Sequence, residues 1–109
     1  MASLNEITRP FLTAAITQAA TGAMITGVAG TTIRVYALVL SVATTTTVQF
    51  KDGATALSGA MTLTAGIPLA LEYFPDMRPL YVCSAGADFT LTLGAAIQTS
   101  GTVWYTTQT

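Results

Sequence analysis

The chain has 109 residues, of which 51% are hydrophobic and only 8% are charged, and its formal net charge is −1. This length suits one domain, and the abundance of threonine and valine favours β structure. The four basic residues, Arg9, Arg34, Lys51 and Arg78, are scattered, which argues against a nucleic-acid partner because such a partner is bound by clustered cations. The single cysteine, Cys83, excludes an intrachain disulfide.

No segment of the sequence has the pattern of a membrane span or an export signal. The longest apolar run, from Val35 to Val42, is interrupted by Ser41 and is far shorter than the ~20 residues of a spanning helix. Residues 1–10 lack the basic segment and apolar run of a secretory signal. We therefore expect a soluble protein that is made in the cytoplasm and has no membrane partner.

The N-terminal segment differs in composition from the rest of the chain. Residues 1–11, MASLNEITRPF, hold two of the nine charges and a proline, and they predict an extended arm. The remainder, residues 12–109, then forms one domain. Alternating residues predict its first strand over 12–17, and glycines on either side predict a short second strand over 23–28.

The clearest predicted strand covers residues 32–43, TIRVYALVLSVA. Its β-branched and aromatic residues disfavour the alternative of a helix. Both of its faces are apolar, which predicts a central strand that is covered on both sides or faces a neighbour. One predicted face holds Ile33, Val35, Ala37 and Val39, and the other holds Tyr36, Leu38, Leu40 and Val42.

Shorter strands follow, separated by turns that contain glycine. In the segment 45–51, alternation predicts that Val48 and Phe50 point inward. About eight short strands without a convincing helix predict an all-β fold, a compact antiparallel β-sandwich or a barrel. The other predicted strands are 61–63, 68–73, 80–84, 89–93 and 102–107.

The stretch QFKDGATALSGAM, residues 49–61, places the only lysine beside an aspartate and two glycines. A phosphate-binding P-loop requires a lysine directly after its second glycine, but Ala60 and Met61 follow Gly59. A calcium loop requires several alternating carboxylates, whereas Asp52 stands alone. Asp-Gly between two alternating runs is typical of a tight turn, so we interpret this stretch as a hairpin.

The sequence offers little for catalysis, and we expect neither enzymatic activity nor a cofactor or metal. It contains no histidine, which removes the usual general base and the commonest zinc ligand. Glu72 with Asp76 or Asp88 is the possible acid pair, but solvated turn positions explain these acids better. Cys83 lies in the apolar context LYVCSAG, which predicts a buried and inert thiol.

The segment EYFPDMRP, residues 72–79, combines aromatic, charged and stiff residues of the types that are enriched in protein interfaces. It is either an interface or a loop that caps the end of the sandwich. The arm either lies along a neighbouring subunit as an added strand or is a frayed terminus. The candidate interface residues in these segments and the last strand are Leu4, Ile7, Arg9, Phe11, Tyr73, Phe74, Asp76, Met77, Arg78 and Trp104.

Two segments, TTVQFKDGATALSGAMTLTAG (46–66) and FTLTLGAAIQTSGTVWY (89–105), follow the apolar strand IRVYALVLSVA. Together they resemble the small β-sandwich decoration, or cement, proteins on the capsids of tailed bacteriophages. Those sequences have a strand ending Val-x-Phe-x-x-Gly, a Leu-x-Gly-x-Met-x-Leu hairpin, and a Leu-x-Leu strand before a final Gly-x-Val-x-Tyr strand. The resemblance spans roughly residues 31–105 and rests on packing and turn motifs.

The resemblance implies a jelly-roll-like sandwich on the outer capsid surface of the virion. It also implies a homotrimer that clamps neighbouring subunits of the major capsid protein, with no catalytic residues. An alternative is a glycan-binding module that uses Trp104, Tyr105 or Tyr73 as a stacking platform, and a tail or fibre component of the virion is a further alternative. High apolar content with few charges favours the decoration protein.

Overall fold

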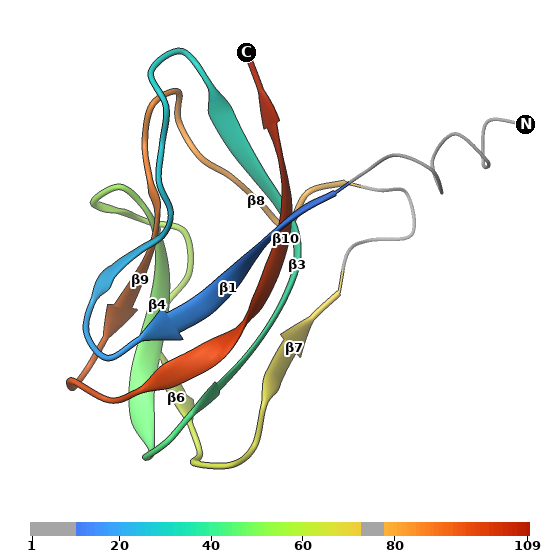
Figure 1. Cartoon of the computed structure of the whole chain (residues 1–109). Coiled ribbons are helices and arrows are strands. Elements are labelled where there is room, and N and C mark those ends of the chain that lie inside the picture. Colours follow the sequence, from blue (N-terminus) through green and yellow to red (C-terminus); the bar gives the residue numbers. More distant parts are fainter. Residues whose placement is uncertain (1–10, 73–77) are drawn as a thin grey trace, which may run out of the picture.

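The computed structural model describes residues 11–72 and 78–109, and the regular structure in these ranges is entirely β. Ten strands form two antiparallel sheets of five strands each, which we call sheet A and sheet B (Figure 1). No helix among the described residues is long and apolar enough to span a membrane. The prediction of an all-β antiparallel sandwich is confirmed.

Sheet A contains the longest strands of the molecule. Its order is β1 (Leu12–Gln18), β10 (Thr99–Gln108), β3 (Thr32–Val42) and β7 (Leu69–Leu71). The short strand β8 (Tyr81–Val82) pairs with β3 beyond the end of β7. β3 therefore has neighbours along both edges, which confirms that it is a central strand.

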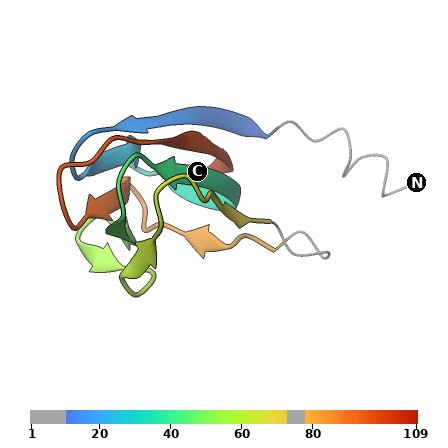
Figure 2. The ribbon, with the colours of Figure 1, turned by 90° about the horizontal axis from the view of Figure 1, so that it is seen from below.

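Sheet B forms the second layer, as the view in Figure 2 shows. Its order is β2 (Gly22–Ile25), β9 (Phe89–Leu93), β4 (Thr46–Asp52) and β5 (Thr55–Ala56), and β6 (Met61–Leu63) also pairs with β4. The chain crosses repeatedly between the layers, because β1, β3 and β10 belong to sheet A while β2, β4 and β9 belong to sheet B. This alternation brings the two apolar inner faces together.

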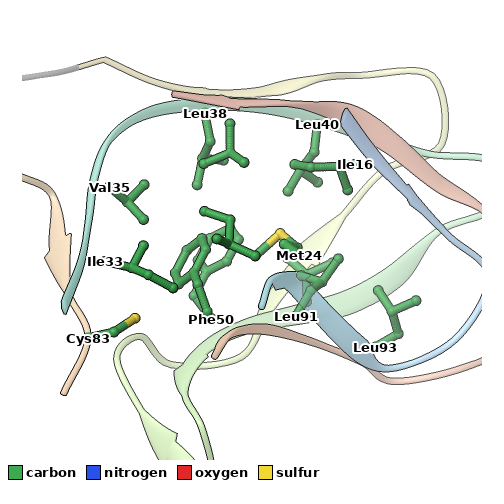
Figure 3. Packing of buried hydrophobic residues seen from close by; sticks show 14 of the residues in the cluster. Ile16, Met24, Ile33, Val35, Leu38, Leu40, Phe50, Cys83, Leu91 and Leu93 are labelled. Carbon is green, nitrogen blue, oxygen red and sulfur yellow. The ribbon is translucent and has the colours of Figure 1, made fainter. Parts of the chain in front are cut away.

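One apolar core fills the space between the sheets, and Figure 3 shows residues of both sheets pointing toward Phe50. Val48 and Phe50 of β4 are fully buried, as their alternation predicts. The Phe50 ring stacks on Phe89 with centroids 5.8 Å apart, and it tilts against Tyr81 at 5.7 Å. Burial in this cluster raises the pKa of Tyr81.

A bulge in β3 changes which of its residues face the core. Trp104 lies opposite Ala37 and Tyr105 lies opposite Val35, so Tyr36 is an extra residue in β3. The bulge interrupts the alternation of faces, so that Val35 before it and Leu38 after it both face the core. The inner face of β3 holds Ile33, Val35, Leu38, Leu40 and Val42.

The predicted faces of this strand were consequently wrong beyond Val35. Ala37 and Val39 do not share a face with Ile33, and they lie half-buried on the outer side of sheet A. A strict period of two cannot locate a bulge, since the inserted residue moves every later side chain to the opposite face. The apolar residues on both predicted faces are explained largely by this shift.

Several strand limits differ from the predicted ones. β10 begins at Thr99, three residues before the predicted start, because residues 99–101 continue the pairing with both β1 and β3. β2, β7 and β8 are shorter than predicted, and β5 was not predicted. The small polar residues of TSGT lack the apolar alternation from which strands are predicted, and a two-residue strand has no period at all.

The Asp52-Gly53 turn prediction is confirmed. Asp52 pairs with Thr55 across the β4–β5 hairpin, and Gly53 has φ 59° at the first position of the two-residue turn. This conformation favours glycine because a side chain there is strained. The stretch that contains the lysine is therefore a reversal of the chain in sheet B.

Candidate functional site

Few charges reach the surface in the described part of the chain. Within residues 11–72 and 78–109, the exposed charged residues are Glu72 and Arg78, and the other four are half-buried. Threonine, alanine and glycine make up most of the exposed positions. Such a surface is inexpensive to remove from water, because burying charged groups would require compensating partners.

The outer face of sheet A is a candidate interaction surface, because Trp104 and Val82 lie on it. Val103 of β10 is fully buried, so its neighbour Trp104 points to the outer side, where it is half-buried. The strand register places Thr13 and Ala37 directly beside Trp104. We call the outer surface formed by Thr13, Arg34, Ala37, Val82, Trp104 and Thr106 the Trp104 face.

An aromatic pair lies beside the Trp104 face. Tyr36, the bulge residue, is buried but does not belong to the core cluster between the sheets. The ring of Phe11, directly before β1, lies over it with centroids 5.1 Å apart and an angle of 48° between the rings. This contact joins the start of β1 to β3 across the intervening β10.

The structure places three of the predicted interface residues. Phe11 packs on Tyr36, Trp104 lies on the outer side of sheet A, and Arg78 is exposed just before β8. The predicted arm otherwise lies outside the described ranges, as does the centre of EYFPDMRP. The predicted interface residues in those undescribed ranges are Leu4, Ile7, Arg9, Tyr73, Phe74, Asp76 and Met77.

The three aromatic residues of the predicted glycan platform differ in their surroundings. In the strand register Trp104 is flanked by Thr13 and Ala37, neither of which is an acid or an asparagine. Tyr105 is half-buried and packs against the core. Tyr73 lies outside the described ranges.

Polar contacts at one end of the sandwich hold its turns, and one of them, between Asp52 and Ser84, joins the two layers. Oδ2 of Asp52, the last residue of β4, accepts hydrogen bonds from the backbone N of Ser84 at 3.0 Å and from its Oγ at 2.7 Å. Oδ1 of Asp88, just before β9, accepts a hydrogen bond from the backbone N of Gly27 at 2.6 Å. The Asp88 carbonyl also accepts a hydrogen bond from the Gly53 N at 2.8 Å.

Cys83 is almost completely buried, within electrostatic range of Asp52 and Asp88. Burial, followed by the negative charges of Asp52 and Asp88, raises the pKa of its thiol to about 11. A thiol reacts as its thiolate, so this environment suppresses its nucleophilicity. The prediction of a buried cysteine is confirmed, and its surroundings fit the predicted lack of reactivity.

The carboxylates of Asp52 and Asp88 stabilise the turns at this end of the sandwich. One oxygen of each carboxylate is used to hold a neighbouring turn, whereas Asp52 Oδ1 is buried without a hydrogen-bond partner among the described residues. In the same ranges, no three His, Cys, Asp or Glu residues come together as possible metal ligands. The two acids near Cys83 are Asp52 and Asp88. This pair differs from the possible acid pair of the sequence analysis, which joined Glu72 to Asp88.

Arg34 is a residue of the Trp104 face that the sequence interpretation did not single out. It lies between the buried Ile33 and Val35 and therefore points to the outer side of sheet A. Its Nε atom is buried and has no hydrogen-bond partner among the described residues. A lone charge within the otherwise apolar TIRVYALVLSV is the signal that would have identified it.

Comparisons with known proteins add no relative. The chain matches no protein-family model, no curated protein and no solved structure. A functional proposal for this chain therefore rests on its own residues and geometry.

Proposed function

We propose that this chain is a structural protein of a virion, a decoration or cement protein on the outer capsid surface of a tailed bacteriophage. In this role it forms a homotrimer that clamps neighbouring subunits of the major capsid protein. The resemblance in residues 31–105 suggested this role from packing and turn motifs. The observation that best supports it is a sandwich whose described surface is almost free of exposed charge.

Burying a surface of this kind in a protein contact is energetically favourable. Removing apolar area from water contributes about 25 cal/mol per Å². The described surface is dominated by alanine, threonine and glycine, and it exposes several large apolar side chains, so contacts over it cost little charge desolvation. The exposed large apolar side chains are Leu12, Val28, Ile67 and Val82.

Symmetry multiplies these weak contacts. When copies of a small protein are joined to one another, a second and third contact with the shell become intramolecular events with a high effective concentration. Individually modest interfaces then hold firmly without a large charged footprint. A small sandwich with a rigid, densely packed core suits this task, since it presents its surface with little loss of conformational freedom.

The test is binding of the purified full-length chain to capsids of the phage whose genome encodes it, prepared from a mutant that lacks its gene. We expect saturable co-sedimentation with the expanded shells and an increase in their melting temperature. A control with a capsid of unrelated lattice should bind none of the chain. Protein that remains in the supernatant at every concentration, without any effect on shell melting, would refute the proposal.

A further inference from the structure

Arg34 occupies an unusual position for a charged residue. In the strand register it lies beside Val82 of β8 and Thr106 of β10, neither of which carries a charge. Its side chain is half-buried, and its Nε is both shielded from solvent and without a hydrogen-bond partner among residues 11–72 and 78–109. The guanidinium group is thus partly desolvated without compensation from these neighbours.

A partly desolvated cation of this kind favours an anionic partner. A buried donor that lacks a partner lowers stability, and the loss is larger for a charged group than for a neutral one. Arginine is enriched at interface hot spots, because its planar group forms two parallel hydrogen bonds with a carboxylate. Trp104, another residue type that is enriched there, lies diagonally from Arg34 on the same face of sheet A.

The described part of the chain has one acid that is suited to this role. Asp52 and Asp88 are half-buried, and each already accepts hydrogen bonds that hold a turn. Glu72 is exposed at the end of β7, directly after Leu71, which packs against the core. No hydrogen bond or ion pair of the Glu72 carboxylate is present with the described residues.

Arg34 and Glu72 do not meet within one chain. Leu71 lies opposite Leu38, so Glu72 follows it at the level of Ala37, three residues along β3 from Arg34. Because Tyr36 is the extra residue of the bulge, Ala37 and Arg34 lie opposite Trp104 and Thr106, so this separation is two strand positions, or roughly 7 Å along β3. No ion pair joins these two opposite charges within the described residues, so each is available to a different molecule.

We propose that Arg34 of one copy binds Glu72 of a neighbouring copy, so that the Trp104 face is the surface through which copies of this chain associate. The inference rests on the proposed function, since it names the contact that joins the copies of the oligomer. The occupant is a second copy because the chain itself supplies the complementary carboxylate. The contact places a charge-assisted bidentate pair beside Trp104 on an otherwise uncharged surface.

The experiment is a charge swap that is followed by sedimentation equilibrium of the full-length chain. Arg34→Glu and Glu72→Arg each place like charges against one another, and each should weaken association by about 10- to 100-fold. The double variant Arg34→Glu with Glu72→Arg should recover most of the wild-type association. Lys51→Glu is the matched control, because Lys51 is a half-buried cation on β4 of sheet B, beside Thr90 and Ala56.

Circular dichroism and thermal melting establish that each variant is folded, and the double swap gives a positive readout if one single variant folds poorly. Equal association of the wild type and both single variants would overturn the inference, as would a double variant that fails to recover or a wild type that stays monomeric. Capsid co-sedimentation of the same proteins separates this inference from the proposed function. Variants that bind shells normally while association is unchanged would refute the Arg34–Glu72 contact alone.

Discussion

The carboxylate of Asp52 accepts two hydrogen bonds from Ser84, one from its backbone N at 3.0 Å and one from its Oγ at 2.7 Å. Asp52 is the last residue of β4 in sheet B. Ser84 comes after β8 of sheet A, with Cys83 between them. The contact therefore ties the two layers together at the end of the sandwich where the β4–β5 turn lies. Hydrogen bonds to a charged group are stronger than neutral ones, so this pair contributes more than an ordinary loop contact.

Asp52→Ala should lower the free energy of unfolding by about 1–3 kcal/mol, because both hydrogen bonds to Ser84 are lost. Ser84→Ala should cost less, since the backbone N of residue 84 still donates to Oδ2. Urea denaturation checks the order of the two effects. Ser41→Ala, on the outer side of sheet A, is the control and should change stability by less than either variant; equal stability of Asp52→Ala and wild type would contradict the fastening role.

Gly27 lies where a side chain has no room. A Cβ atom there would come within 2.6 Å of the Ala87 carbonyl group and would also collide with the carbonyl oxygen of Gly86. Backbone atoms cannot rotate away, so Gly27→Ala should destabilise the protein by at least about 2 kcal/mol in a thermal or urea unfolding experiment.

Gly59→Ala is the matched control for this substitution. No atom lies within 4 Å of a Cβ built at Gly59, and this residue is not among the glycines with positive φ. Alanine there should therefore be neutral or slightly stabilising, because it reduces the freedom of the unfolded chain. A Gly27→Ala variant that is as stable as Gly59→Ala would show that the turns at this end are not closely packed.

Phe50 is the centre of the aromatic core. It is fully buried and contacts both Phe89 and Tyr81 at ring-centroid distances below 6 Å. Phe50→Leu keeps an apolar side chain but removes the ring contacts and leaves a void, so we expect a loss of about 1–2 kcal/mol. Denaturant titration measures this loss. Tyr81→Phe retains the ring and should have a smaller effect; the reverse order of the two variants would contradict the described packing.

The thiol of Cys83 should make stability depend on pH in the alkaline range. An unfolded cysteine ionises at about pH 8.5, whereas the pKa of Cys83 in the folded protein is raised to about 11. The unfolded chain thus releases its proton first, and the contribution of the thiol, complete below about pH 8.5, is lost as the pH rises toward about 11.

Cys83→Ala should therefore flatten the alkaline decline of the unfolding free energy, by about 2–3 kcal/mol between these two pH values. The comparison uses the slope with pH and not the absolute stability, because removing the buried sulfur also leaves a small void. Tyr81 titrates in both proteins and so does not affect the difference. Parallel pH profiles for Cys83→Ala and wild type would show that the thiol is not protected by the fold.

The regular parts of the fold could be predicted from the sequence because their burial follows a simple period. Phe50 and Leu91 point inward from strands in which apolar and polar residues alternate without interruption. The Asp52-Gly53 reversal could be predicted as well, since glycine at the first turn position relieves strain. These features depend on neighbours in the sequence.

The remaining features depend on contacts between distant residues, which no local pattern contains. The bulge at Tyr36 is defined by the pairing of β3 with β10. The hydrogen bond between Asp52 and Ser84 joins residues that are 32 positions apart in the sequence. The charge of Arg34 is visible in the sequence, but its lack of a partner is a property of the assembled sheet. For the same reason, the Trp104 face could be predicted only as far as Trp104 itself.

The proposed place of this chain on the outer capsid surface is most directly tested by a cryo-EM reconstruction of the particle encoded by the same genome, with a particle from a deletion mutant as the comparison. We predict density for a two-layered sandwich on the outside of the capsid, bridging neighbouring capsid subunits in groups of three copies and missing from the deletion particle. Density for the chain in the tail or a fibre, or identical capsid surfaces in the two reconstructions, would contradict the account.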